Sequence, residues 1–289
     1  MPHLFTNRPR LYNPIKTDKS GNHYLDWESI NALLYIVGGL TFIAGSIFFL
    51  PRYDSFSDIG AWIFFGGSLI YLVVTGQDLL ESTAYLRRQK QRTVWNWLEF
   101  IVANVYVAGT ILFTVGSLLF LSQIDAIVAG GWCFTIGSLF FLIGACLNVI
   151  QIVQEGSFVK LQLLNATAIS FAIGSTLFLI ASMPYLSETL DLENNWVLFA
   201  YVGWEYIFGS LLFFLGGIIN YYRSYQRKQY YQEDSVMVER RKILDRAKKL
   251  QHHQDLPVPS CDVKISTALE ELEKGEDTPD KDYMLSEHN

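Results

Sequence analysis

Four polar side chains interrupt otherwise apolar stretches of this sequence and could carry chemistry: Glu205, Asp78, Asn148 and Asn220. A carboxyl group held at membrane depth can exchange a proton or bind a cation, so such residues are the first place to look for function. Glu205 lies deepest by count, four residues before Gly209. Two interpretations stay open for it: a glutamate solvated at the membrane interface, or a desolvated proton or cation site. Asp78 is interpreted as a polar group at a helix end.

The sequence carries no recognisable catalytic or metal-binding motif. A phosphate loop, a nucleophile elbow, a paired-carboxylate cluster and a His-Glu metal motif are all missing. The five histidines fall outside the apolar stretches, and the three cysteines have no metal or redox spacing. We therefore expect a protein that is not an enzyme and that binds no cofactor, metal or nucleic acid.

The elements that hold the four polar residues are six long apolar stretches. They cover residues 32–50, 59–77, 101–122, 126–154, 161–186 and 196–222. Asp78 directly follows the second stretch, and Glu205 is the only acidic or basic residue inside the six. Charged residues make up 17% of the chain, against about 25% in soluble domains. A helix of about 20 residues crosses a bilayer core of roughly 30 Å. The expected fold class is an all-α membrane protein with six transmembrane helices.

Basic residues are distributed unevenly between the segments that join these helices. Of the 22 Lys and Arg, four precede Trp27, four lie between 87 and 92, one is Lys160, twelve follow Tyr222, and only Arg52 lies in an odd-numbered loop. Basic residues are retained on the cytoplasmic side during insertion. Both chain ends and the even-numbered loops are therefore predicted to be cytoplasmic.

One pattern recurs in every predicted helix: an aromatic residue, two residues, Gly-Ser, two residues and a second aromatic residue. The Gly-Ser pairs are Gly45-Ser46, Gly67-Ser68, Gly116-Ser117, Gly137-Ser138, Gly174-Ser175 and Gly209-Ser210. These positions share one helix face, on which a small notch lies between two rings. Membrane helices use small residues for close backbone approach, so we interpret the motif as a packing surface. An aromatic-lined pore is the alternative.

Residues at two further offsets from the motif glycine distinguish the even-numbered helices from the odd-numbered ones. Tryptophan stands five residues before the glycine only in even helices, and Asp78, Asn148 and Asn220 stand eleven after it. The true repeat is therefore a two-helix hairpin. The predicted domains are a cytoplasmic segment 1–30, hairpins 31–81, 97–153 and 161–222, a basic cytoplasmic loop 82–96, a basic amphipathic cytoplasmic helix 223–253, and an acidic, disordered tail 254–289.

The hairpin resembles the YrhK-like domain, a short bacterial two-helix membrane module. The residues that carry the resemblance are Gly-Ser-Ile-Phe-Phe-Leu at 45–50, Trp-Ile-Phe-Phe-Gly-Gly-Ser-Leu at 62–69, and the Gly-Ser segments 116–121 and 137–142. The third hairpin matches less well, because Thr176 replaces an aliphatic residue and Glu205 follows its tryptophan. The resemblance implies three tandem copies in a bacterial inner membrane and brings no catalytic residues with it.

The leading functional hypothesis is a non-enzymatic membrane protein with a structural, assembly or sensing role. It depends on the density of packing motifs and on the long cytoplasmic tail, which could hold a protein partner in addition to the lipid bilayer around the helices. The runner-up is a channel or transporter for a small solute or ion that uses Glu205. A polar cavity that reaches Glu205 would favour transport, and a dry interface would favour the first hypothesis.

Overall fold

The computed structural model describes residues 27–152, 158–187 and 195–253, and these residues are all-helical. The long helices are α1 (Trp27–Phe48), α2 (Ser57–Arg88), α3 (Val94–Leu119), α4 (Ile127–Ile152), α5 (Phe158–Ser182) and α6 (Trp196–His253), with short 3₁₀ helices η1 (Pro51–Phe56) and η2 (Met183–Leu186). All six long helices contain a span that is long and apolar enough to cross a membrane. The prediction of six apolar helices is confirmed, and they indicate a multi-pass membrane protein.

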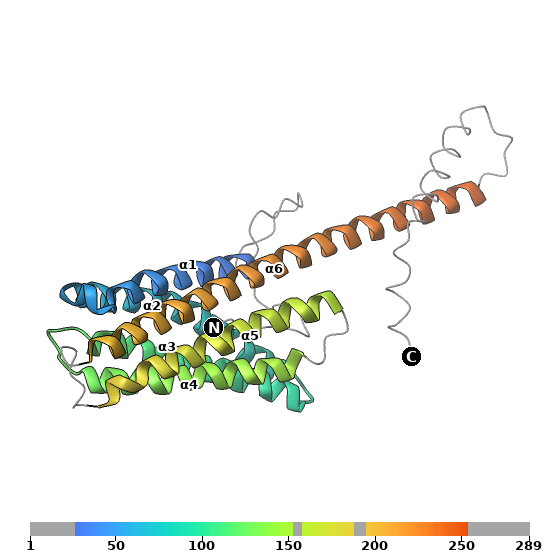
Figure 1. Ribbon diagram of the computed structural model, residues 1–289. Helices are drawn as coiled ribbons and strands as arrows, with labels where there is room; N and C mark the ends of the chain where they lie inside the picture. The colour runs from blue at the N-terminus through green and yellow to red at the C-terminus, as the bar shows by residue number, and fades with distance from the viewer. Residues whose placement is uncertain (1–26, 153–157, 188–194, 254–289) are drawn as a thin grey trace. The chain divides into compact units, whose positions relative to one another are not determined.

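The described residues up to Arg227 form one compact unit, and those from Lys228 to His253 belong to a second. Within the first unit the helices run side by side (Figure 1), and each of α2, α3 and α4 packs against both of its neighbours in the chain. Helix α6 completes the bundle from two sides. It meets α5 where Phe213 covers Gly174, and it meets α1 where Phe214 covers Gly39.

Helix α2 is longer than the sequence predicts. It continues to Arg88, so residues 82–88 of the predicted loop 82–96 are helical, and only residues 89–93 connect α2 to α3. Ser82 and Leu86 are buried, which extends the packed face of α2 by two turns. Arg87 and Arg88 lie in the last turn, where positive charge is favourable to the helix dipole. The Thr93 side chain accepts a hydrogen bond from the Asn96 backbone and caps α3.

The boundary predicted at Tyr222 is also absent. Helix α6 continues through this position to His253, so the predicted segment 223–253 is helical but is not a separate helix. Arg223 and Ser224 are buried, because the packed face of α6 extends one turn beyond Asn220. The side chains after Gln226 and the predicted tail 254–289 lie outside the described residues, as does the N-terminal segment up to Asp26.

The outer surface of the bundle is apolar. Exposed Leu, Ile and Val side chains occur on all six long helices, as a lipid-facing surface requires. The three tryptophans at the start of the even helices have nearly the same exposure: Trp62 54%, Trp132 51% and Trp204 51%. They lie towards the end of the bundle that carries η1 and η2, which we call the η end. Their equal exposure fits a common interfacial depth.

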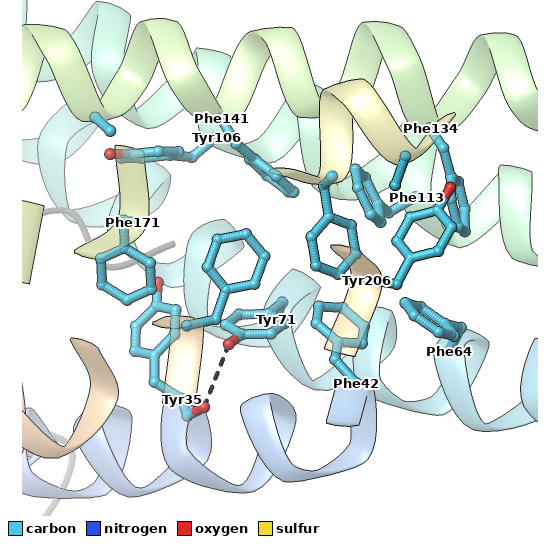
Figure 2. Close-up of a cluster of buried hydrophobic side chains, with 14 of the residues drawn as sticks. Tyr35, Phe42, Phe64, Tyr71, Tyr106, Phe113, Phe134, Phe141, Phe171 and Tyr206 are labelled. Carbon is cyan, nitrogen blue, oxygen red and sulfur yellow. Dashed lines mark hydrogen bonds between the residues drawn. The ribbon is translucent and has the colours of Figure 1, made fainter. Parts of the chain in front are cut away.

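The centre of the bundle is filled by aromatic rings (Figure 2). Grouped by their equivalent positions in the three helix pairs, and read towards the η end, they fall into five sets of three, which we call tiers. The tiers are Tyr35, Tyr106 and Phe171; Tyr71, Phe141 and Phe213; Phe42, Phe113 and Phe178; Phe64, Phe134 and Tyr206; and Phe49, Phe120 and Tyr185. In the third tier the ring centroids are 5.7 to 6.3 Å apart, and in the fourth 5.8 to 6.3 Å. Aromatic pairs favour such separations.

Helix α5 packs in a register that differs by seven residues from the Gly-Ser alignment. Gly174 faces Phe213 and the Gly209 carbonyl. In the second helix pair, the equivalent position, which faces Phe141 and the Gly137 carbonyl, belongs to Gly109 and not to the motif glycine Gly116. The place of Gly116-Ser117 in α3 is taken in α5 by Ala181-Ser182. Ser182 Oγ donates to the Phe178 carbonyl at 2.6 Å, as Ser117 Oγ donates to Phe113 at 2.7 Å. The third hairpin therefore does not superpose on the others through its Gly-Ser pairs.

Candidate functional site

The six motif glycines all lie at contacts between neighbouring helices. The motif glycine Gly137 faces Gly109 of α3. A methyl group added at either glycine would lie 3.1 Å from the carbonyl oxygen of the other. The pair Gly174 and Gly209 has the same reciprocal geometry, at 3.0 and 3.1 Å. Backbones this close leave no room for a side chain, which is the packing role that the motif predicts.

The motif serines are fully buried and divide into two groups. In α1, α3, α5 and α6 the hydroxyl donates to the carbonyl four residues earlier, at 2.7 Å in each helix. Ser46 and Ser210 also bring their Oγ atoms within 3.1 Å of each other, which joins α1 to α6. Ser68 Oγ and Ser138 Oγ, in α2 and α4, have no hydrogen-bond partner among the described residues. The serines thus serve mainly as small residues that leave few polar atoms unpaired.

A layer of buried polar side chains lies at the end of the bundle opposite the η end. Each even helix contributes two of them, three residues apart: Asp78 and Glu81 from α2, Asn148 and Gln151 from α4, and Asn220 and Arg223 from α6. Their exposed fractions run from 1% to 9%. We call these six residues the polar layer. It brings together three of the four polar residues singled out from the sequence.

A hydrogen bond connects the polar layer to the aromatic tiers. Asn148 Nδ2 donates to the Tyr106 hydroxyl at 2.7 Å, and Asp78 is close enough to that hydroxyl to interact with it electrostatically. Arg223 donates through Nε and Nη2 to Asn220 Oδ1, at 3.2 and 2.9 Å. Tyr106 of the first tier therefore contacts the layer directly.

Glu205 lies apart from the polar layer. It precedes Asn220 by fifteen residues on the same helix, which is about 22 Å along the helix axis at 1.5 Å per residue. Its side chain is partly exposed, between the half-exposed Trp204 and the buried Tyr206. This position is at the flank of α6, near the η end.

Sequence reasoning missed half of the polar layer. Glu81, Gln151 and Arg223 stand at or beside the edges of the predicted hairpins, although each is buried. A signal was present, because all three stand fourteen residues after the motif glycine of their helix. In α4 and α6 this is one heptad beyond the small packing residues Gly144 and Gly216. Two heptads return to nearly the same helix face, so a polar residue there belongs to the packed side of the helix.

The polar layer has two chemical capabilities. It places two carboxyl groups, one guanidinium and three amides in a buried setting, where charges of both signs stabilise one another only in fixed geometry. A contact such as that of Asn148 in α4 with Tyr106 in α3 holds helices in register. The carboxyl groups of the layer could also bind a proton or a cation. Among the described residues, no group of three His, Cys, Asp or Glu side chains could hold a metal ion.

A comparison with protein families identifies two copies of the repeat. A model of the YrhK-like protein family matches residues 26–83 and 96–153. Two segments of the chain therefore match the YrhK-like family, and we call them the YrhK-like domains. Each covers one helix pair, α1 with most of α2 and α3 with α4, so the resemblance read from the Gly-Ser segments is confirmed for these two copies. A search of curated proteins and a search of solved structures find no match.

The YrhK-like domains include two of the three polar pairs. Asp78 and Glu81 lie in the first domain, and Asn148 and Gln151 lie in the second. Asn220 and Arg223 lie in the helix pair that the family model does not match, and this pair is also the one with the shifted register. The third copy stays a prediction, which rests on its Gly-Ser motifs and on the rings that it adds to every aromatic tier.

Proposed function

We propose that the protein is a non-enzymatic scaffold of the bacterial inner membrane, with a structural, assembly or sensing role. It is built as three tandem helical hairpins with both ends in the cytoplasm, the third hairpin being a divergent copy of the YrhK-like domain. The η end then faces outward and the polar layer faces the cytoplasm. The protein presents the cytoplasmic part of α6 and the tail to a protein partner.

The observation that carries this proposal is the aromatic filling of the bundle. Rings from all three hairpins meet across the centre in the third and fourth tiers, and contacting rings of successive tiers have centroids 4.6 to 6.4 Å apart. A transport pathway needs polar groups or water along its length. The tiers separate the polar layer from the η end, and Glu205 lies to one side of them.

Cysteine labelling tests the topology. In a variant whose native Cys133, Cys146 and Cys261 are replaced by serine, Ser55→Cys should react with a membrane-impermeant maleimide on intact cells. Gln91→Cys should react only after the cells are opened. Both positions are exposed in the structure, so burial does not limit the reaction. Labelling of Gln91→Cys alone on intact cells would reverse the orientation.

Flux measurements test the scaffold against the transport alternative. Proteoliposomes that contain the purified chain should show the same proton and potassium flux as empty liposomes, because stacked rings occupy the centre of the bundle. A pH-sensitive dye and a potassium electrode measure the two rates. The Glu205→Gln variant is the control, and it should fold and behave as the wild type does. A flux that appears with the protein and disappears with Glu205→Gln would favour a transporter.

A second arm of this experiment addresses assembly directly. Cross-linking in native membranes compares the full chain with a chain that ends at Arg227, where the first compact unit ends. A scaffold that acts through its cytoplasmic segment should lose its cross-linked partner in the shorter chain while its melting behaviour in detergent is retained. Identical cross-linking patterns would count against a role for this segment.

A further inference from the structure

A cavity of about 950 Å³ opens at the η end of the bundle. Its lining comes from all three hairpins: the end of α1 with η1, the α3–α4 connection with the start of α4, and η2 with α6. This volume is at the upper end of the range for small-molecule sites, which is about 300 to 1,000 Å³. None of the residues of the polar layer, and none of the motif glycines, contributes to it.

The floor of the cavity is the fifth aromatic tier. Phe49, Phe120 and Tyr185 all line it, and they meet edge to face, with ring centroids 5.7 Å apart for Phe49 and Phe120 and 5.1 Å apart for Phe120 and Tyr185. Trp132 and Phe199 add further aromatic surface to the walls. The cavity therefore has the character of an aromatic cage, in which ring faces attract positive charge.

The charged groups that line the cavity, among the described residues, have one sign. Asp54 from η1 and Asp125 from the α3–α4 connection both belong to this lining, and no described Lys, Arg or His does. Asp54 is also close enough to Tyr185 in the floor to interact with it electrostatically. A ligand that satisfies this lining has an apolar body and a positive charge.

The backbone around Asp125 is held in an unusual conformation. Asp125 has a φ of 48°, and it is the only non-glycine residue with positive φ in the part of the chain that the structure describes. Two backbone hydrogen bonds fix this turn: Asp125 N to the Leu121 carbonyl at 3.0 Å and Ala126 N to the Leu119 carbonyl at 3.3 Å. The left-handed region is rare for residues other than glycine, and such outliers gather at functional sites.

The rim is also braced between two hairpins. Asp58 at the start of α2 accepts hydrogen bonds from both the backbone N and the hydroxyl of Ser122, at 2.7 and 2.5 Å. These bonds tie the first hairpin to the α3–α4 connection that carries Asp125. A braced rim keeps the cavity formed without ligand, which lowers the cost of binding.

We propose that this cavity binds a soluble organic cation, an ammonium group on an aromatic or alkyl body, from the outer side of the membrane. The aromatic floor contacts the apolar body of the ligand and attracts its ammonium group. Asp54 and Asp125 neutralise the positive charge of that group. The cavity and its ligand do not depend on the scaffold role, and only the side of the membrane rests on the topology proposed above. The ammonium headgroup of a lipid has the same chemistry, so the test must separate these two sources.

Binding of benzyltrimethylammonium to the full chain in detergent tests the proposal, with calorimetry or Trp fluorescence as the readout. We expect saturable binding, with benzenesulfonate, an anion of similar size, failing to bind. The double variant Asp54→Asn/Asp125→Asn should bind at least about tenfold more weakly, which corresponds to about 1.4 kcal/mol. Ala129→Trp should also abolish binding by filling the cavity, because Ala129 is an exposed lining residue.

Glu205→Gln is the matched control, since Glu205 is a carboxyl group towards the same end of the bundle that does not line the cavity. It should bind benzyltrimethylammonium as the wild type does. Equal affinity for benzenesulfonate, or unchanged affinity in the double Asp variant with a wild-type melting temperature, would overturn the proposal. Displacement of the probe by phosphatidylethanolamine in nanodiscs, with no such effect from phosphatidylglycerol, would assign the cavity to a lipid headgroup and overturn the soluble-cation version.

Discussion

Replacing Gly67 by leucine should destabilise the bundle strongly, whereas the same change at the neighbouring Gly66 should have little effect. A side chain at Gly67 would meet Thr41 and approach the ring of Phe42 to 2.9 Å. That ring cannot move aside, because it is buried and stacks on Phe64 and Tyr71 with centroids 5.1 Å away in both cases. Overpacking of a filled core costs about 1–3 kcal/mol or more.

Gly66 is a close control because it shares the helix, the depth and the residue type. A side chain there would meet nothing within 4 Å. A leucine at this position faces outward, and in a membrane it would contact lipid. Unfolding by SDS titration of protein in mixed micelles measures the free energy of unfolding for both variants. Equal loss of stability at Gly66 and Gly67 would mean that general helix propensity, not close packing, explains the motif.

The fold was predictable because the membrane imposes strong rules on sequence. A span needs a long uncharged stretch, and every such stretch in this chain became a helix. Helix ends were less predictable. The buried Ser82 and Leu86 extend α2 through a segment whose basic residues suggested a loop, and the buried Arg223 carries α6 past Tyr222. Charge marks the side of the membrane, but burial decides where a helix ends.

The polar layer was predictable only in part, because burial near the helix ends cannot be read from the apolar stretches. Asp78, Asn148 and Asn220 stood out because they interrupt apolar stretches, whereas Glu81, Gln151 and Arg223 lie where polar residues are expected anyway. Their burial depends on how far the bundle extends beyond the apolar spans. The cavity at the η end was not predictable, because its lining combines residues from three connections that are distant in the sequence.

The shifted register of α5 shows a limit of motif alignment. The three odd helices and the residues that directly follow them carry aromatic residues at seven-residue spacing: Tyr35, Phe42 and Phe49; Tyr106, Phe113 and Phe120; and Phe171, Phe178 and Tyr185. A slide by one heptad keeps the same face towards the core, so the spacing alone does not choose between two registers. Alanine at position 181 is small enough to occupy the place of Gly45 or Gly116, and it is fully buried there.

The two registers assign Phe178 to different tiers, and alanine substitution distinguishes them. Aligned by its Gly-Ser pair, Phe178 corresponds to Phe120, which is only partly buried in the fifth tier. In the structure it corresponds to Phe113, at the centre of the third tier, and both rings have 0% exposure. Phe178→Ala should therefore cost about 3–5 kcal/mol, as expected for a fully buried phenylalanine, and should match Phe113→Ala.

Phe120→Ala is the control for this comparison, since Phe120 stands at the same offset from its own motif glycine. It should cost less than Phe178→Ala, because part of its ring already faces the cavity at the η end and its removal only enlarges an open space. The same SDS titration gives all three free energies of unfolding. If Phe178→Ala and Phe120→Ala proved equal while Phe113→Ala cost more, the Gly-Ser alignment would hold for α5, and the third hairpin would repeat the two YrhK-like domains without a shift.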